Sequence, residues 1–256
     1  MTVVVAVPAR LESSRLPGKV LADIAGRPML AWVLERCRAA RSAQAVFCCS
    51  DSPAVLALAR QQGVIALATP HPCQSGSERL AQALPAILQH LGDPPPAQTL
   101  VINVQADQPF LDPALIDALA AHWQQRAPQP AVLTPVVRLD QERLHDPSVV
   151  KALLRRDGEA LAFSRSAIPH LRGVDPAHWA ARWPYWGHVG VYAYRADVLA
   201  RWPQLPPSPL EAIEQLEQWR LLEAGISIHT LEVSQDPLAV DTPAQLEQAR
   251  RLQPPA

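Results

Sequence analysis

The apolar run Val3-Val4-Val5-Ala6-Val7, which ends at Pro8, decides the fold class of this chain. Consecutive β-branched and apolar residues, without polar alternation, are typical of a strand that is buried on both faces of a parallel sheet. A loop rich in arginine and containing one glycine, residues 9–19, follows this run directly. The start of the chain therefore predicts a central strand whose carboxyl end carries cationic side chains.

Outward from this strand, short apolar segments alternate with helical patterns. We expect further strands at 44–49, 64–68 and 99–104, and helices at 28–40, 53–62 and 77–91. This alternation implies right-handed crossovers and a mostly parallel, doubly wound, Rossmann-like α/β sheet. Such a sheet binds ligands beyond the carboxyl ends of its strands. The loops at 8–19, 69–79 and 105–109 are therefore expected to converge on one crevice.

The rhythm changes after Ala131. Strand candidates at 131–137, 161–164 and 187–194 are separated by polar and Trp-rich loops. We interpret residues 131–194 as an insertion that covers a substrate and takes part in dimer formation, within a single domain spanning residues 1–256. A helix at 209–224, a strand at 228–233 and a helix at 242–252 complete the expected elements.

Composition narrows the class of function. A formal net charge of -1 and a pI near 6.7 give no general attraction to polyanions, so nucleic-acid binding is disfavoured. No apolar run approaches the roughly 18 residues of a membrane span, and the first strand has no basic leader, so we expect a cytoplasmic protein without membrane partners. The four cysteines (Cys37, Cys48, Cys49 and Cys73) lack the spacing of metal or redox motifs and are expected to be free thiols.

The loop after the first strand has the chemistry of a phosphate site. Its backbone N–H groups can wrap phosphates, while Arg10, Arg15 and Lys19 can neutralise a triphosphate. The loop matches neither G-x-G-x-x-G nor G-x-x-x-x-G-K-[ST], which disfavours a dinucleotide dehydrogenase and a P-loop ATPase. On spacing alone, three basic side chains on a loop are more often a solvated surface than a binding site.

Two aspartates stand at the ends of distant strands. Asp107 follows the apolar strand at 99–104, where a hard cation bound to phosphates needs an oxygen ligand. Its alternative role is a helix N-cap, for which Asp112 is better placed. For Asp241, spacing alone favours an N-cap, because Thr242 and Pro243 begin a helix. Both aspartates meeting around one Mg²⁺ would explain the two positions together.

Several segments, in order along nearly the whole chain, resemble the 3-deoxy-manno-octulosonate (Kdo) cytidylyltransferase family. The segments are Pro8–Lys19, Gln74–Arg79, Val104–Asp107, Phe163–Arg165, His188–Tyr192, Ser208–Gln218 and Val240–Pro243. Many sugar nucleotidyltransferases share the first, whereas the Gln-Ser-Gly and Ser-Pro-Leu-Glu segments are more specific. The resemblance implies a nucleotidyltransferase fold of the GT-A-like kind and transfer of CMP from CTP to the anomeric hydroxyl of Kdo, for lipopolysaccharide synthesis.

The resemblance also implies roles for individual residues. Those implied for CTP are Arg10, Arg15, Lys19, Gln74, Ser75, Gly76 and Arg79. The catalytic set would be Lys19, Asp107 and Asp241, with Asp107 and Asp241 holding Mg²⁺. The Kdo pocket would comprise Gln105, Arg165, Arg172, His188, Tyr192, Glu211 and Gln218. A homodimer is implied as well.

Each sugar-site residue also has a purely structural interpretation. His188 can be a satisfied interior histidine, Tyr192 a packing aromatic, and Glu211 with Glu214 and Gln218 part of one polar helix face. The chain also departs from the family near this pocket: Ala106-Asp107-Gln108-Pro109 replaces Gly-Asp-Glu-Pro, and the Trp-rich loop 179–186 is unusual. Transfer to another acid sugar, such as 8-amino-Kdo or a nonulosonate, and a non-catalytic nucleotide-binding regulator therefore stay as alternatives. The sequence gives no order of substrate binding.

Overall fold

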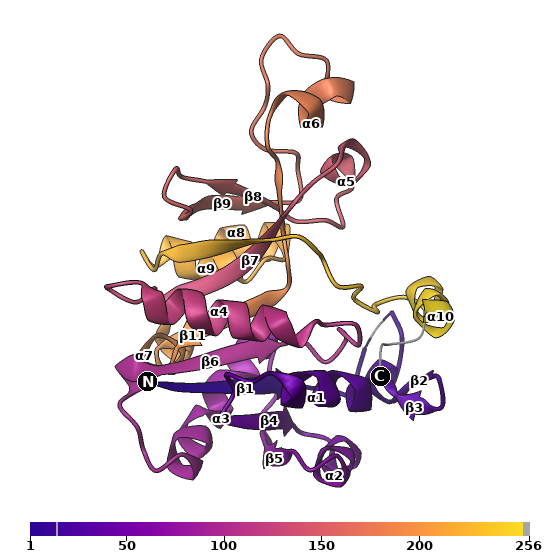
Figure 1. The fold of residues 1–256 in the computed structure, drawn as a ribbon, viewed down its shortest axis with the longest axis vertical. Coiled ribbons are helices and arrows are strands. Elements are labelled where there is room, and N and C mark those ends of the chain that lie inside the picture. Colours follow the sequence, from indigo (N-terminus) through magenta and orange to yellow (C-terminus); the bar gives the residue numbers. More distant parts are fainter. Residues whose placement is uncertain (14, 253–256) are drawn as a thin grey trace. The chain divides into compact units, whose positions relative to one another are not determined.

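The computed structural model describes residues 1–13 and 15–252, so Ser14 of the basic loop lies outside the described residues (Figure 1). The chain forms two compact units. Unit 1 comprises Met1–Gln124, Val191–Pro203 and Pro237–Ala256, and unit 2 comprises Gln125–Gly190 and Gln204–Asp236. The expected insertion at 131–194 corresponds in large part to unit 2, which in addition includes the segment 204–236.

Unit 1 is built on a sheet with β1 at its centre. The strand order is β5 (Ile65–Ala68), β4 (Ala45–Ser50), β1 (Thr2–Pro8), β6 (Thr99–Val104) and β11 (Val191–Arg195). The first four strands run parallel, and β11 pairs with β6 in the antiparallel direction. Residues 4–7 of β1 have no exposed surface, as the unbroken apolar run predicts. The expected α/β fold with a mostly parallel sheet is confirmed.

Helices cover this sheet between its strands. They are α1 (Met29–Ala39), α2 (Pro53–Gln61), α3 (Gly76–His90), α4 (Pro113–Gln125), α7 (Ala196–Ala200) and α10 (Pro243–Leu252). Short 3-10 turns (Lys19–Leu21, Pro96–Gln98 and Trp202–Gln204) and a small hairpin, β2 (Asp23–Ile24) with β3 (Arg27–Pro28), lie in the connections. Serine residues begin two of the helices: Ser52 accepts from Val55 N, and Ser75 accepts from Glu78 N.

The strands of unit 2 are grouped around β7. β7 (Val132–Arg138) lies between β12 (Ile228–Val233), which is parallel to it, and β10 (Trp186–His188), which is antiparallel. β8 (Lys151–Leu154) pairs with β10 and with β9 (Ala160–Ser164). The short helices of this unit are α5 (Gln141–His145), α6 (Trp179–Arg182), α8 (Pro209–Glu214) and α9 (Gln218–Glu223), together with a 3-10 turn at Pro176–His178.

Two elements that were expected to be continuous are each divided in the structure, so these two predictions are wrong. The strand expected at 187–194 is two strands, β10 and β11, which belong to different units. The helix expected at 209–224 is interrupted, because Gln215 adopts a left-handed conformation with φ 54° between α8 and α9. Glu211 and Gln218 therefore do not share the face of one helix. Hydrophobic periodicity also gave no indication of α5, α6, α7, β8 or the β2–β3 hairpin.

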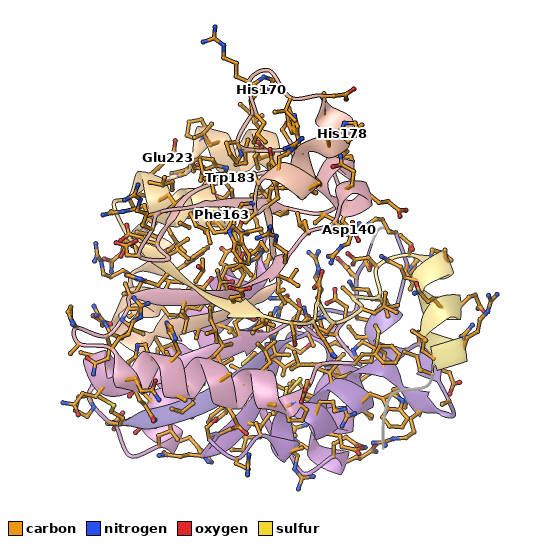
Figure 2. All side chains as sticks on the ribbon, turned by 45° about the horizontal axis from the view of Figure 1, so that its top comes forward. Asp140, Phe163, His170, His178, Trp183 and Glu223 are labelled. Carbon is orange, nitrogen blue, oxygen red and sulfur yellow. The ribbon has the colours of Figure 1, made fainter. Side chains whose placement is uncertain are left out.

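The Trp-rich segment of unit 2 is organised around Trp179. The Trp179 ring stacks on Tyr185 with centroids 6.2 Å apart and meets the edge of His170 at 5.0 Å. Its indole N–H donates to Val174 O, and the Tyr185 hydroxyl donates to Pro169 O. Figure 2 labels Trp183, His170 and His178 in this segment. These contacts give the segment a small aromatic core, which explains its unusual composition.

Candidate active site

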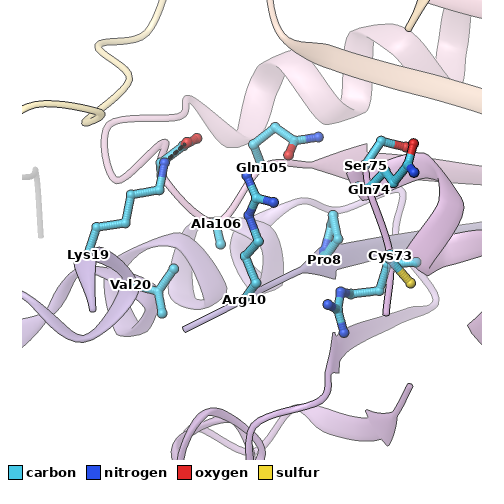
Figure 3. Close-up of a pocket in the computed structure, with 12 residues that line it drawn as sticks. Pro8, Arg10, Lys19, Val20, Cys73, Gln74, Ser75, Gln105 and Ala106 are labelled. Carbon is cyan, nitrogen blue, oxygen red and sulfur yellow. Dashed lines mark hydrogen bonds and ion pairs between the residues drawn. The ribbon is translucent and has the colours of Figure 1, made fainter. Parts of the chain in front are cut away.

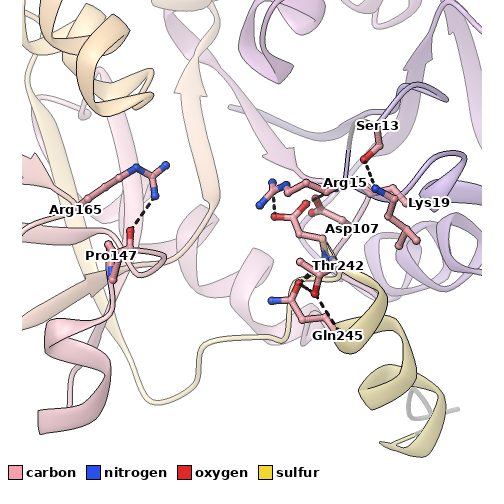
Figure 4. Close-up of polar contacts among 10 residues, drawn as sticks. Ser13, Arg15, Lys19, Asp107, Pro147, Arg165, Thr242 and Gln245 are labelled. Carbon is pink, nitrogen blue, oxygen red and sulfur yellow. Dashed lines mark hydrogen bonds and ion pairs between the residues drawn. The ribbon is translucent and has the colours of Figure 1, made fainter.

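Two aspartates from distant parts of unit 1 meet at one lysine. Lys19 Nζ donates to Asp107 Oδ2 and to Asp241 Oδ1, each at 2.6 Å, and Arg15 Nη2 lies 3.0 Å from Asp241 Oδ2 (Figure 4). Asp107 follows β6, and Asp241 precedes α10. A backbone hydrogen bond of 2.9 Å from Val240 N to Asp107 O joins the two loops. The expected proximity of these two carboxylates is thus present.

The charges in this cluster stabilise one another. Burial lowers the pKa of the Lys19 ammonium, but the Asp107 and Asp241 carboxylates outweigh that effect and hold the pKa above its ordinary value. Burial likewise raises the pKa of Asp241, and the hydrogen bonds and charges of Lys19 and Arg15 more than reverse this and lower it. Lys19 and Asp241 are therefore both charged at neutral pH.

Neither aspartate is needed as a helix cap. Asp112 accepts from Ala114 N at 2.9 Å and so caps α4, as the sequence predicts. Thr242 Oγ1 accepts from Gln245 N, and Gln245 Oε1 accepts in return from Thr242 N, so Thr242 occupies the capping position of α10. The capping role that spacing favoured for Asp241 is therefore filled by its neighbour, and the Asp241 carboxylate faces Lys19.

A hollow lies beside this cluster, at the carboxyl ends of β1 and β6 (Figure 3). It brings together parts of the loops at 8–19, 69–79 and 105–109, as expected for a doubly wound sheet. Its lining residues are Pro8, Arg10, Lys19, Val20, Cys73, Gln74, Ser75, Gly76, Arg79, Gln105, Ala106 and Asp107. Most of the residues that the family resemblance assigns to CTP thus line one cavity. Gln105, which the resemblance assigns to the sugar, lines the same cavity.

The first turn of α3 forms one wall of the hollow. Ser75 caps the helix, and Glu78 Oε2 accepts from Gln74 N at 2.6 Å, so a Ser-x-x-Glu capping pattern fixes the chain here. The positive end of the helix dipole and the Arg10 side chain face the same space. This wall is suited to an anion such as a phosphate.

Arg79 anchors the floor of the hollow. Its side chain is 4% exposed and donates to Thr69 Oγ1 at 2.7 Å and to Asp51 Oδ2 at 2.9 Å. Asp51 and Thr69 follow β4 and β5, so Arg79 ties the carboxyl ends of two strands to α3. Its guanidinium therefore acts first as a structural anchor, while its position on the lining keeps a contact with nucleotide as a prediction. Sequence patterns gave no indication of Asp51 as its partner.

The sugar-site candidates of unit 2 form two groups. Arg165 is anchored through its Nε, which donates to Glu214 O at 2.8 Å, and through Nη1, which donates to Pro147 O at 3.0 Å (Figure 4). Glu214 also accepts from Arg165 N and from the Ser164 hydroxyl. Glu214, which the sequence offered only as part of a polar helix face, is thus the residue that positions Arg165.

The second group surrounds His188. Its Nε2 lies 2.9 Å from Thr134 Oγ1, and its Nδ1 lies 3.3 Å from Gln218 Nε2. The Phe163 ring, labelled in Figure 2, meets the His188 ring edge-on at 5.4 Å. Gln218 is 2% exposed, and its Oε1 has no partner among the described residues. A buried acceptor without a donor is uncommon in a folded protein, and the role of Gln218 in sugar binding stays a prediction.

The environment of His188 gives a pH prediction. Burial lowers the pKa of His188 from 6.5 to about 3, so the folded protein keeps it neutral where the unfolded chain protonates it. Stability is therefore lost as pH falls below about 6.5, at about 1.4 kcal/mol per pH unit. Between pH 7 and pH 5 the wild type should lose about 2 kcal/mol more unfolding free energy than His188→Asn. Urea titrations with equal losses in both proteins would contradict this.

Three further sugar-site candidates have surroundings of their own. Glu211 pairs with Arg220 at 2.7 Å, which links α8 to α9. Arg172 is exposed on the loop before the Trp-rich segment. Tyr192 belongs to unit 1, where it is buried and stacks on Tyr194 with ring centroids 5.6 Å apart. Roles of these three residues in sugar binding stay predictions.

The arrangement in unit 1 defines a class of protein: an α/β nucleotidyltransferase, in which a cationic loop and Asp107 follow parallel strands and Asp241 meets them at Lys19. The sequence model of the cytidylyltransferase family matches residues 4–228. Among curated relatives, the chain is 40% identical over 249 residues to the 3-deoxy-manno-octulosonate cytidylyltransferase of Acidobacterium capsulatum, covering 96% of this chain and 94% of the relative. It is 42% identical over 260 residues to that of Methylibium petroleiphilum, covering 98% and 95%.

Solved structures agree with this relationship. The structure of CMP:2-keto-3-deoxy-manno-octonic acid synthetase complexed with CTP matches with a TM-score of 0.87 and 37% identity, covering 98% of each chain. A cytidylyltransferase of Leptospira borgpetersenii, at 14% identity and a TM-score of 0.61, shares the fold. The chain belongs to the 3-deoxy-manno-octulosonate cytidylyltransferase family, and it is a nucleotidyltransferase enzyme. Among the described residues, no helix is long and apolar enough to cross a membrane.

Proposed function

We propose that this enzyme transfers CMP from CTP to the anomeric hydroxyl of Kdo, with release of pyrophosphate. The observation that carries the proposal is the meeting of Lys19 with Asp107 and Asp241 beside a hollow that Arg10 and the first turn of α3 also line. Cationic side chains, a helix N-terminus and two carboxylates are together the parts that a metal-bound triphosphate requires. The choice of CTP as the nucleotide and of Kdo as the acid rests on the names of the relatives reported above.

In the proposed reaction, the anomeric oxygen attacks the α-phosphorus of CTP, the bond from that phosphorus to the bridging oxygen breaks, and the hydroxyl proton passes to solvent. Arg10, Arg15 and Lys19 bind the triphosphate and balance the charge that grows on pyrophosphate. Lys19 can exchange a carboxylate partner for phosphate oxygens, because its ammonium is a compact charge on a flexible stem. The acceleration then comes from positioning and electrostatics.

The residues present fit a Mg²⁺ ion. Its usual protein site consists of one or two carboxylates, completed by substrate phosphates and water. Asp107 and Asp241 provide two such carboxylates within reach of one cation, the Lys19 ammonium. Among the described residues, no group of three or more His, Cys, Asp and Glu side chains could hold a metal alone. Bound Mg²⁺ would stabilise negative charge on the phosphate oxygens.

On the sugar side, unit 2 offers groups that match an acid with several hydroxyls. The Arg165 guanidinium, set in place by Glu214 and Pro147, can pair with a carboxylate. The unpartnered Gln218 Oε1 beside His188 can accept from a hydroxyl. These contacts support an acid sugar as the second substrate.

A panel assay tests the function. Purified enzyme with CTP and Mg²⁺ is given Kdo, 8-amino-Kdo or a nonulosonate, and pyrophosphate release is followed. We expect kcat/KM for Kdo to exceed that for the other acids at least tenfold, and to exceed that with UTP in place of CTP. A higher kcat/KM for another acid would replace Kdo as the substrate. CTP binding without pyrophosphate release from any acid would favour a non-catalytic regulator.

The proposal includes a homodimer in the cytoplasm. Support for the dimer comes from exposed apolar side chains of unit 2, among them Ile213 at 78% and Leu161 at 54% exposed. Burial of exposed apolar side chains between two subunits is favourable. A monomer mass by light scattering at micromolar concentration would contradict the dimer, and recovery of the enzyme outside the cytoplasmic fraction of its cells would contradict the location.

A further inference from the structure

A chain of polar side chains leads from the hollow into the interior of unit 1. Gln105 Nε2 donates to Asn103 Oδ1 at 3.1 Å, and Asn103 Nδ2 donates to Ser77 Oγ at 3.5 Å. Ser77 Oγ lies 2.8 Å from the Tyr194 hydroxyl. Asn103, Ser77 and Tyr194 have no exposed surface. A buried polar group is costly unless it is hydrogen-bonded, so an amide in the apolar strand β6 needs these partners.

The orientation of the Asn103 amide sets that of the Gln105 amide. Asn103 directs its NH₂ group to Ser77 and its oxygen to Gln105. Two facing amides require one donor and one acceptor. Gln105 therefore turns Nε2 towards Asn103, and its Oε1 is left as an acceptor at the wall of the hollow.

Gly76 leaves room for this amide. A Cβ atom at position 76 would lie 3.2 Å from both Nε2 and Oε1 of Gln105, and 3.0 Å from Pro8 Cγ. Such contacts are shorter than normal packing allows, so a side chain at this position would displace the amide. The bare Cα of Gly76 lets Gln105 lie against the first turn of α3, in the hollow that Arg10 and Lys19 also line (Figure 3).

We propose that Asn103 is a positioning residue for cytidylyl transfer: it holds Gln105 so that Oε1 accepts a hydrogen bond from a substrate hydroxyl. The inference rests on the proposed function, because it requires substrate in this hollow. Both proposed substrates carry hydroxyl groups, on the ribose of CTP and on the sugar acid. Asn103 itself is fully buried and acts only through Gln105.

A double-mutant cycle tests this role. Asn103→Ala should raise the KM of one substrate about tenfold, the worth of one well-placed hydrogen bond, with a smaller change in kcat. In the Gln105→Ala background the same replacement should change that KM less than twofold, because the residue it positions is gone. Ser77→Ala, which frees the Asn103 amide to turn and removes no volume from β6, should show the same coupling at a smaller size.

A matched control separates positioning from stability. Thr99 is another buried polar residue of β6, and its hydroxyl donates to Pro95 O at 3.0 Å. Thr99→Val should lower the melting temperature and leave both KM values unchanged. The positioning role is overturned if Asn103→Ala and Ser77→Ala each raise KM by the same factor in the wild-type and Gln105→Ala backgrounds. It is also overturned if neither variant changes KM when Gln105 is present.

Substrate analogues identify the hydroxyl. If the hydroxyl belongs to the ribose, Asn103→Ala should raise the KM of CTP. It should not raise the KM of the analogue that lacks the recognised hydroxyl, which is either 2′-deoxy-CTP or 3′-deoxy-CTP. If it belongs to the acid, the KM of the acid should rise and that of CTP should not. Should no acid yield pyrophosphate, the proposed function fails on its own. The double-mutant cycle is then measured with the Kd for CTP in place of KM. A smaller effect of Asn103→Ala in the Gln105→Ala background supports the role of Asn103, and an equal effect in both backgrounds overturns it.

Discussion

Replacing Asp107 with alanine is expected to lower kcat about a thousandfold, since it removes one of the two carboxylates proposed to hold Mg²⁺ against the triphosphate. The fold should survive, because Lys19 retains Asp241 at 2.6 Å and the lost ion pair is partly solvated. We expect a loss of about 1 kcal/mol or less in unfolding free energy. Steady-state pyrophosphate release at saturating CTP and Mg²⁺, with urea unfolding in parallel, measures both quantities.

Asp112 offers the matched control in the same loop. Asp112→Ala removes the cap of α4 and should cost about 1 kcal/mol of stability with turnover nearly unchanged. The two variants are thus expected to differ in opposite ways: Asp107→Ala loses turnover and keeps most of its stability, whereas Asp112→Ala loses stability and keeps its turnover. Near-normal turnover of Asp107→Ala at ordinary Mg²⁺ concentrations would show that the metal assignment is wrong.

The fold of unit 1 follows from local sequence patterns to a large extent. The run at 3–7 has no polar position, which only a strand covered on both faces tolerates, and β1 is indeed the central strand. Helices α2 and α3 begin where a serine precedes the helical pattern, and each serine caps its helix. Local chemistry at these positions agrees with the tertiary structure.

Unit 2 was less predictable, because its boundaries depend on contacts distant in sequence. Residues 187–194 have the composition of one strand, and only pairing partners divide them: Gly187 pairs with Val137, whereas Tyr192 pairs with Asn103. The break after Glu214 depends on a left-handed conformation at Gln215, a residue that carries no glycine-like signal for it. Neither feature is visible in hydrophobic periodicity.

In the candidate site, too, local sequence patterns indicate some of the residues, and long-range contacts determine the others. The basic loop and Asp107 could be assigned from their place after predicted strands, whereas spacing favoured Asp241 as a cap. The backbone bond between Val240 and Asp107 brings Asp241 to Lys19, and no local pattern encodes it. Asn103 did carry a signal, since an amide inside an apolar strand must find a buried partner. Its partner Ser77, which in turn meets the Tyr194 hydroxyl, required the structure.

Replacing Lys19 with methionine is expected to lower kcat/KM about a hundredfold to a thousandfold, because it removes a cation that we propose binds the triphosphate. The variant should also bind Mg²⁺ or Mn²⁺ more tightly in the absence of nucleotide. In the wild type the Lys19 ammonium occupies both carboxylates at 2.6 Å and repels a divalent ion. Without it, the ion pair of Arg15 with Asp241 is what remains to balance the two carboxylates among the described residues.

Mn²⁺ binding followed by electron paramagnetic resonance measures this second effect, for which we expect at least a fivefold lower Kd. Arg27→Met is the matched control, because it removes a cation of the same unit whose partner, Glu35, is not proposed to bind metal. It should leave Mn²⁺ affinity and kcat/KM within twofold of the wild type. Weaker or unchanged Mn²⁺ binding by Lys19→Met would mean that the two carboxylates do not form a metal site once the ammonium is gone, and that the ammonium itself is their permanent counter-ion.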